Sequence, residues 1–221
     1  MKVNILKLLL IIPLVVFSCK GKRGDIQQEE PAKQEDTTAM QTNLIFNPAD
    51  LPEEPVFDIV TNVGTIRIKL YKETPKHRDN FVALASKGFY NGIRFHRVIQ
   101  GFMIQTGDPL SKDMANVASF GTGGPGYTIP AEILSQFTHK KGAVAAARRG
   151  DAGNPARESS GSQFYIVENP GSCAQLDGDY SIFGETISGF EVIDIIAATP
   201  TNQRDLPLSD IIISAVKPVI E

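Results

Sequence analysis

The stretch that most restricts the fold of this chain is residues 56–71, which read VFDIVTNVGTIRIKLY. Its residues Ile66, Ile68 and Leu70 alternate with polar ones, and a period of two is typical of a strand with one buried face. Residues 62–64 lie between the two halves and supply a short turn. We therefore predict a half-buried β-hairpin, whose inner face has to be covered by the rest of the chain.

The remainder of the sequence predicts two helices among short strands. Thr74 is suited to an N-cap, Pro75 to the first helical position and Gly88 to the position just beyond the end of a helix. Residues 189–197 predict a second helix, and the other apolar runs are short and joined by glycine-rich segments. The expected fold is mainly β, a closed eight-stranded antiparallel β-barrel capped by two α-helices.

The N-terminal residues predict export. Lys2 and Lys7 precede an apolar run at 8–17, which is shorter than the ~20 residues that a membrane-spanning helix needs. The run ends in VFSC, which resembles the lipobox of bacterial lipoproteins, so we expect a signal peptide at 1–18 and a lipid on Cys19. A plain signal peptide or a short membrane anchor is the alternative. The expected location is the bacterial cell envelope, anchored to a membrane and facing the periplasm or the exterior.

Residues 19–53 are expected to form a flexible tether, because they contain few large apolar residues and many Gln, Glu, Lys and Thr. Leu44, Ile45 and Phe46, near its end, are candidates to dock on the domain that follows. We expect that domain to span 54–221. The net charge of −3 provides no general electrostatic footprint for nucleic acid, and no nucleic-acid partner is expected.

Residues 121–126, GTGGPG, satisfy the spacing G-x-G-x-x-G of dinucleotide sites. Such a site needs a helix that begins directly after the glycines, and Pro125 with the following YTIP segment argues against one. We interpret these glycines as a turn-rich loop with positive φ angles.

The candidates for a metal or a nucleophilic centre stand apart from one another. His77, His96 and His139 lack the spacing of metal ligands. We expect His77 on the exposed side of its helix and His96 in or near the core. Ser162 is interpreted as a surface or turn serine, and Cys173 as an inert loop thiol. No metal and no other cofactor is expected.

Residues 95–108, FHRVIQGFMIQTGD, place one cation among apolar and amide side chains. On a strand, Phe95 and Arg97 share one face and His96 points the other way. A bend at Gly101 then returns the chain to the same side. By itself this pattern is also typical of a half-buried strand pair with a surface arginine.

Taken with later segments, this stretch resembles the cyclophilins, the cyclosporin-binding family of peptidyl-prolyl cis/trans isomerases. The resemblance covers roughly residues 54–216 and includes GSQF at 161–164 and LDG at 176–178. This combination is far more specific than the motifs above. It implies a cyclophilin-like fold, rotation about X-Pro peptide bonds as the reaction, and no cofactor.

The resemblance also implies roles for single residues. Arg97 matches the catalytic arginine. The residues that match the substrate contacts form an apolar wall, a pair of amides and a backbone contact: Phe102, Met103, Tyr165 and Leu176; Gln105 and Gln163; Ala147 with Arg148. Tyr180 stands at the wall of the same pocket.

Several positions depart from the family pattern. Gln175 replaces a Trp that packs on cyclosporin, so we expect weak cyclosporin binding with activity retained. Tyr180 replaces a His and Tyr165 a Phe, and we expect their hydroxyls to alter the preference for the residue before proline. Arg148 replaces an Asn at the backbone contact. The loop at 148–161 is longer than in compact members, and we expect it to be mobile and to gate or extend the peptide groove.

The implied reaction needs no nucleophile, because rotation about an X-Pro bond makes and breaks no bond. Its barrier of ~18–20 kcal/mol comes from amide resonance. We expect an isomerase that acts on unfolded or flexible polypeptides with exposed X-Pro bonds and assists the folding of exported proteins. The alternative is a proline-peptide-binding chaperone module without significant turnover, which would not need Arg97.

Overall fold

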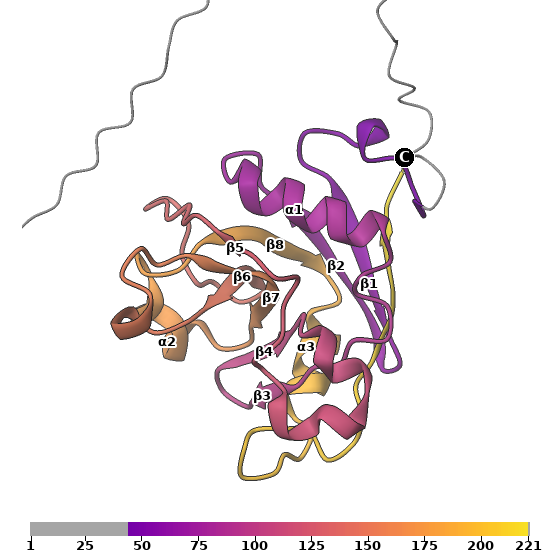
Figure 1. Ribbon diagram of the computed structural model, residues 1–221, viewed down its shortest axis with the longest axis vertical. Coiled ribbons are helices and arrows are strands. Elements are labelled where there is room, and N and C mark those ends of the chain that lie inside the picture. Colours follow the sequence, from indigo (N-terminus) through magenta and orange to yellow (C-terminus); the bar gives the residue numbers. More distant parts are fainter. Residues whose placement is uncertain (1–43, 221) are drawn as a thin grey trace, which may run out of the picture. The chain divides into compact units, whose positions relative to one another are not determined.

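The computed structural model describes residues 44–220, which form a mainly β structure (Figure 1). The strands are β1 Val56–Thr61, β2 Gly64–Leu70, β3 Arg97–Ile99, β4 Met103–Thr106, β5 Thr128–Ile129, β6 Ala143–Arg148, β7 Ser159–Val167, β8 Ile182–Ser188 and β9 Ile213–Pro218. The helices are α1 Pro75–Ser86, α2 Pro170–Cys173 and α3 Phe190–Ala197. Short 3-10 helices lie between them: η2 Pro48–Asp50, η3 Pro109–Lys112, η4 Met114–Ser119, η5 Asp151–Gly153 and η6 Ala174–Leu176.

The strands form one antiparallel sheet that curls without closing. Its order is β3-β4-β7-β6-β8-β2-β1-β9, and β5 pairs with β7. An isolated β-bridge pairs Arg94, which precedes β3, with Ile212, which precedes β9. The predicted closed eight-stranded barrel is therefore wrong: the described residues form an open nine-stranded sheet, and β3, with three residues, makes no ladder with β9.

The predicted hairpin and both predicted helices are confirmed. β1 and β2 pair in register up to Thr61 and Gly64, and the alternating Ile66 and Ile68 are fully buried. α1 has Thr74 at its N-cap and ends before Gly88, whose φ is +66°. Figure 1 shows α1 and α3 at opposite ends of the curled sheet. The four-residue α2 was not predicted.

The central strands β4, β6 and β7 are buried on both faces. In β7, Phe164 and Ile166 belong to the larger hydrophobic core, which also contains the buried residues of β1, β2, α1 and α3. Tyr165 and Val167 of the same strand belong to a smaller cluster on the opposite face. Burial on both faces explains why residues 143–147 of β6 and 164–167 of β7 read as continuous apolar runs. The smaller cluster supplies the apolar part of the candidate site.

Residues 44–53, which the sequence placed in the tether, lie beside α1 (Figure 1). The Ile45 N–H donates to the Ser86 carbonyl at 2.7 Å. The ring of Phe46 packs on that of Phe57, with centroids 5.8 Å apart. The docking expected of this apolar stretch is thus present at Ile45 and Phe46.

The signal peptide at 1–18, Cys19 and the tether as far as residue 43 lie outside the described residues. None of the helices within residues 44–220 has the length and apolar character required to cross a bilayer. Export and lipidation therefore stay predictions.

His77 is buried, with 2% of its surface exposed, and the prediction that it faces solvent is wrong. Its ring Nδ1 lies 2.6 Å from Glu132 Oε2, and its Nε2 lies 2.9 Å from Ser159 Oγ. Glu132 also accepts the N–H groups of Lys76 and His77 in the first turn of α1. The arrangement has the chemistry of a Ser-His-Glu triad, but Ser159 is only 1% exposed. It therefore joins α1 to β7 and offers no nucleophile to a substrate.

We predict that His77 makes the fold sensitive to acid. Burial lowers the pKa of His77 despite the opposing effect of Glu132, so the unfolded chain takes up the proton first as the pH falls below the ordinary value of 6.5. His77→Gln should lower the free energy of unfolding by about 1–3 kcal/mol at about pH 8, because it disturbs buried hydrogen bonds. The substitution should also reduce the decrease in the free energy of unfolding that wild type shows between about pH 8 and pH 5.5. Chemical denaturation across this range measures both effects, and an equal loss in the two proteins would contradict the assignment.

Candidate active site

A hollow of about 410 Å³ opens on the face of the sheet that carries the smaller cluster. Nine of the residues that the resemblance assigned to the site line this first hollow: Arg97, Phe102, Met103, Gln105, Ala147, Arg148, Tyr165, Leu176 and Tyr180. The tenth, Gln163, lines a second hollow of about 860 Å³, which shares Gln105, Ala147 and Arg148 with the first. The structure thus brings the predicted residues together, while their roles toward a substrate stay predictions.

The register of the strands sets three of these residues in one row. Arg97 of β3 is paired with Gln105 of β4, and Gln105 is paired with Tyr165 of β7. Paired residues in antiparallel strands project to the same face. The row therefore places a cation, an amide and an aromatic ring side by side, although Tyr165 is far from the other two in sequence.

One feature of the expected pattern is wrong. Phe95 and Arg97 were predicted to share a face, with His96 opposite. In the structure Phe95 belongs to the larger core, and His96 lines the first hollow beside Arg97. The alternation fails because β3 begins only at Arg97, so residues 95–96 do not follow strand geometry. The prediction that His96 lies in or near the core is confirmed, since it is 4% exposed.

Arg97 is available to a ligand at the edge of the first hollow. Its side chain is 44% exposed, and its Nε lies 3.5 Å from Asp205 Oδ2. Within residues 44–220, the two terminal nitrogens of its guanidinium have no hydrogen-bond partner. An arginine is always charged at ordinary pH, so this side chain presents a permanent cation to whatever occupies the hollow.

The amide of Gln105 is oriented by that of Gln163. Gln105 Nε2 donates to Gln163 Oε1 at 3.0 Å, and Gln163 Nε2 donates to the carbonyls of Gly121 and Gly123 at 3.0 and 2.7 Å. Gln163 is 6% exposed, and its hydrogen-bonding groups are used within the protein. Gln105 Oε1 has no hydrogen-bond partner in the described part of the chain, and Gln105 lines both hollows.

The glycine-rich loop at 121–126 is held by a buried carboxylate. Asp108 is fully buried and accepts the N–H groups of Leu110 and Gly121 at 2.8 and 2.5 Å. Gly121 has the expected positive φ, +88°. A Cβ on Gly123 would lie 2.1 Å from Asp108 Oδ1, so only glycine fits there. The glycine motif therefore shapes the wall of both hollows.

Tyr165 ends a chain of hydrogen bonds that runs from the exposed Asp177 through the buried His139. Its hydroxyl lies 2.8 Å from His139 Nε2, and His139 Nδ1 lies 2.6 Å from Asp177 Oδ1. Burial raises the pKa of Tyr165. Partial burial acts to raise the pKa of Asp177 as well, but the hydrogen bonds from His139 outweigh it and lower that pKa. The Tyr165 hydroxyl, expected to alter substrate preference, is thus engaged within the protein and leaves the ring to the hollow.

Arg148 supports the wall formed by Tyr180. Its guanidinium carbon lies 4.5 Å from the centre of the Tyr180 ring, in cation–π geometry. Its Nε donates to the Asp179 carbonyl at 2.9 Å, and it forms an ion pair with Asp151. The Arg148 side chain is 5% exposed, so it acts as packing for Tyr180 and is no free surface cation.

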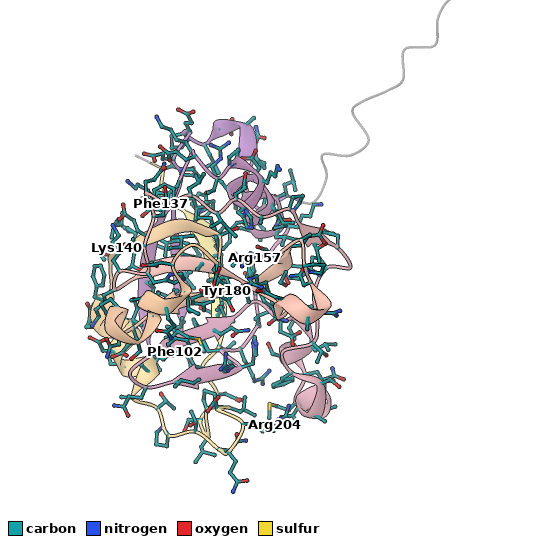
Figure 2. The ribbon with its side chains drawn as sticks, turned by 90° about the vertical axis from the view of Figure 1, so that its left-hand side faces the viewer. Phe102, Phe137, Lys140, Arg157, Tyr180 and Arg204 are labelled. Carbon is teal, nitrogen blue, oxygen red and sulfur yellow. The ribbon has the colours of Figure 1, made fainter. Side chains whose placement is uncertain are left out.

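The loop at 148–161 borders the second hollow and is tied to the segment before Tyr180. Arg157 donates to Asp179 Oδ1 at 2.7 Å, and Figure 2 shows Arg157 next to Tyr180. Asn154 receives the Glu158 N–H at 3.0 Å, which closes the loop on itself. These contacts make the loop part of the wall of the second hollow, and the expectation that it is mobile and gates or extends the peptide groove stays a prediction.

The residues missed by sequence reasoning come from two segments on the rim of the first hollow. Val117 and Phe120 lie in and just after η4, and Arg204 and Leu206 lie in the turn after α3. Figure 2 labels Arg204. No motif indicated them, because the pairing of these two segments is set by contacts between distant parts of the chain. The Arg204 guanidinium donates to the Val117 and Ala118 carbonyls at 3.4 and 3.2 Å.

Two small residues also differ from their interpretation. Ser162 is not a surface serine: it is 4% exposed in β7 and donates to the Gly107 carbonyl at 2.7 Å. Cys173 lies at the end of α2 and is fully buried. Burial raises its pKa to about 11, which favours the neutral thiol near pH 7 and agrees with its interpretation as inert, although it does not lie in a loop.

The curled sheet, the apolar wall and the exposed guanidinium together define a protein of the peptidyl-prolyl isomerase class, whose reaction needs shape and charge without a nucleophile. A family model described as cyclophilin type peptidyl-prolyl cis-trans isomerase matches residues 56–218. The chain belongs to this family, and its activity is peptidyl-prolyl cis-trans isomerisation.

Similar proteins of known sequence and structure agree. A peptidyl-prolyl cis-trans isomerase of Helicobacter pylori is 41% identical over 144 residues, which cover 62% of this chain and 77% of that protein. Peptidyl-prolyl cis-trans isomerase B of Streptomyces anulatus is 37% identical over 185 residues, 75% of this chain and 97% of that protein. A crystal structure of a cyclophilin-type isomerase from Cryptosporidium parvum matches with a TM-score of 0.67 and 31% identity, over 76% of this chain and 99% of that one. The mainly β cyclophilin fold is thereby confirmed.

We predict that the Tyr165 hydroxyl serves stability. Tyr165→Phe leaves His139 Nε2 buried without its partner, and should lower the free energy of unfolding by about 1–3 kcal/mol. Tyr180→Phe is the matched control, because the Tyr180 hydroxyl has no hydrogen-bond partner among residues 44–220, and its effect should be near zero. Equilibrium unfolding in denaturant measures both variants, and equal stabilities would contradict the prediction.

Proposed function

We propose that Arg97 is the catalytic residue and that it acts on the nitrogen of the X-Pro bond. When this bond twists out of plane, resonance is lost and the nitrogen regains a lone pair. A guanidinium directed at that lone pair binds the twisted state better than either planar isomer, which is the condition for catalysis. The observation that carries the proposal is the row of Arg97, Gln105 and Tyr165, which sets a permanent cation beside an aromatic wall.

The other lining residues hold the substrate in register with that charge. We assign the proline ring to the apolar wall formed by Phe102, Met103, Tyr165 and Leu176. Gln105 Oε1 is the group that accepts a backbone N–H of the peptide, and Gln163 fixes its orientation. This assignment revises the direct substrate contact expected of Gln163. A crystal structure of a Cryptosporidium parvum cyclophilin was obtained in the presence of the dipeptide Ala-Pro, which supports a proline peptide as the ligand.

The energy required of the site is modest. A rate gain of ~10⁵ corresponds to about 7 kcal/mol. Restricting the substrate to one orientation in a shaped hollow and placing a fixed charge in a partly dry site are each able to supply several kcal/mol. No acid–base group and no bond-forming group is needed for this sum.

The substrates that we propose are unfolded or flexible polypeptides with exposed X-Pro bonds in the bacterial envelope, whose folding the protein assists. Support comes from the N-terminal sequence alone, with its signal-like residues 1–18 and Cys19.

We also propose weak cyclosporin binding, because Gln175 replaces the family's Trp and is exposed beside Leu176. Titration calorimetry with cyclosporin measures this affinity, and tight binding would overturn the proposal.

Arg97→Ala is predicted to lower kcat/KM for an X-Pro peptide by about 10²-fold or more, the loss typical of removing a group that stabilises transition-state charge. Arg97→Lys keeps the charge but loses the planar fork, and should retain part of the activity. A protease-coupled assay or exchange NMR measures both. Equal rates for wild type and Arg97→Ala would overturn the role of Arg97, and binding without turnover in the wild type would favour the chaperone module.

Cys19→Ala is predicted to release the protein from membranes, because it removes the site of the proposed lipid. Fractionation of cells that produce each form measures the distribution. Wild type should sediment with membranes and the variant should remain in the supernatant. Unchanged membrane retention of the variant would rule out lipidation as the sole anchor.

A further inference from the structure

The turn between α3 and β9 is built around Asn202. The Asn202 side chain accepts the N–H groups of Arg204 and Leu206 at 2.8 and 3.2 Å. The Asn202 carbonyl accepts the Asp205 N–H at 3.0 Å, and Thr201 and Pro207 form a β-bridge at the base. The turn therefore has one defined shape, and its residues Arg204 and Leu206 line the first hollow.

Asp205 is placed by this turn directly beside Arg97. Its φ is +60°, a left-handed conformation that Asp tolerates better than most residues. Its carbonyl accepts the N–H of Val98, the neighbour of Arg97 in β3, at 2.8 Å. Its carboxylate Oδ2 lies 3.5 Å from Arg97 Nε. The backbone of Asp205 thus contacts the strand that carries Arg97, and its side chain contacts the Arg97 guanidinium.

We propose that Asp205 is a positioning residue that holds the Arg97 guanidinium toward the first hollow. This inference rests on the proposed role of Arg97. The carboxylate lies nearest to Arg97 at Nε, and the two terminal nitrogens, which have no hydrogen-bond partner within residues 44–220, can meet the substrate. A long side chain that is 44% exposed samples many rotamers unless a contact restricts it, and no other side chain in residues 44–220 forms an ion pair with Arg97.

The Asp205 carboxylate also offsets part of the positive charge of Arg97. Asp205 therefore has two opposing effects on catalysis: it orients the guanidinium, and it weakens the guanidinium's electrostatic effect on the substrate. Both side chains are more than two-fifths exposed, and water screens the charge offset between such groups. Orientation is not screened, and misplacing a catalytic group by about 1 Å can cost ~10²-fold in rate. Positioning therefore outweighs the offset, and removing the carboxylate should slow the reaction.

The same part of the chain offers a matched control. Asp210 pairs with Arg94, Oδ1 to Nε, at 3.1 Å. The Asp210 carboxylate is exposed to a similar extent as that of Asp205, whereas the Arg94 side chain is 13% exposed and also donates a hydrogen bond to Asp210 Oδ2 at 3.2 Å. Neither residue lines the first hollow. Asp210→Asn therefore weakens a closer carboxylate–arginine pair without touching the site.

The test compares Asp205→Asn, Asp205→Gly and Asp210→Asn in steady-state X-Pro isomerisation below their unfolding temperatures. Asn and Gly both tolerate a positive φ, so the backbone of the turn is kept. We expect kcat to fall by about tenfold in Asp205→Gly and by less in Asp205→Asn, with KM unchanged, because the lost interaction acts in the transition state. Asp210→Asn should match wild type. Wild-type kcat in Asp205→Gly would overturn the proposal.

A double-mutant cycle separates positioning from a loss of structure. In the Arg97→Ala background, Asp205→Gly should cause no further fall in kcat, because the cation that it orients is absent. A full tenfold fall in that background would overturn the proposal. NMR relaxation of the Arg97 Nε–Hε group should show greater motion in Asp205→Gly than in wild type. If Arg97→Ala itself retained wild-type rates, the proposed function would fail, whereas loss in Arg97→Ala with none in Asp205→Gly would overturn this inference alone.

Discussion

Burial of the central strands on both faces is the constraint on which the rest of the structure depends. A strand that is covered on one face alternates buried with partly exposed residues, as β1 and most of β2 do. In β7, Phe164 and Ile166 fill the larger core while Tyr165 and Val167 build an apolar surface behind the first hollow. Any slip of one residue would exchange these two sets, so the core itself fixes the register of the site.

That register accounts for a site without reactive groups. It brings Arg97, Gln105 and Tyr165 into one row, and this row is the arrangement of cation, amide and apolar wall on which the proposed mechanism relies. Hydrogen bonds from neighbouring side chains fix the orientation of two residues in this row. Gln163 orients Gln105, and His139 engages the Tyr165 hydroxyl. The catalytic power proposed for the site thus depends on hydrogen bonds that do not touch a substrate.

Burial also decides how polar clusters in this protein are to be understood. His77 with Glu132 and Ser159, and His139 with Asp177 and Tyr165, both have the hydrogen-bond order of a catalytic triad. Ser159 is closed off from solvent, and the Tyr165 hydroxyl faces a histidine. In both clusters, buried polar groups form hydrogen bonds with one another. Leaving such a group unpaired in the interior would cost more free energy than one hydrogen bond contributes to stability. Arg97 differs because, among residues 44–220, its terminal nitrogens have no hydrogen-bond partner.

The sequence by itself determined the hairpin, the two longer helices, the glycine-rich loop and, through a resemblance, most of the residues that line the first hollow. The hairpin, the helices and the glycine-rich loop are predictable because their periodicity, caps and turns depend on residues a few positions apart. The lining residues were found through motifs shared with the family. Only the tertiary structure decided that the sheet stays open, that His77 and Ser162 are buried, and that Asp205 lies beside Arg97. Each of these depends on a partner many residues away, and the sequence pattern around one residue contains no information about which distant residue will pack against it.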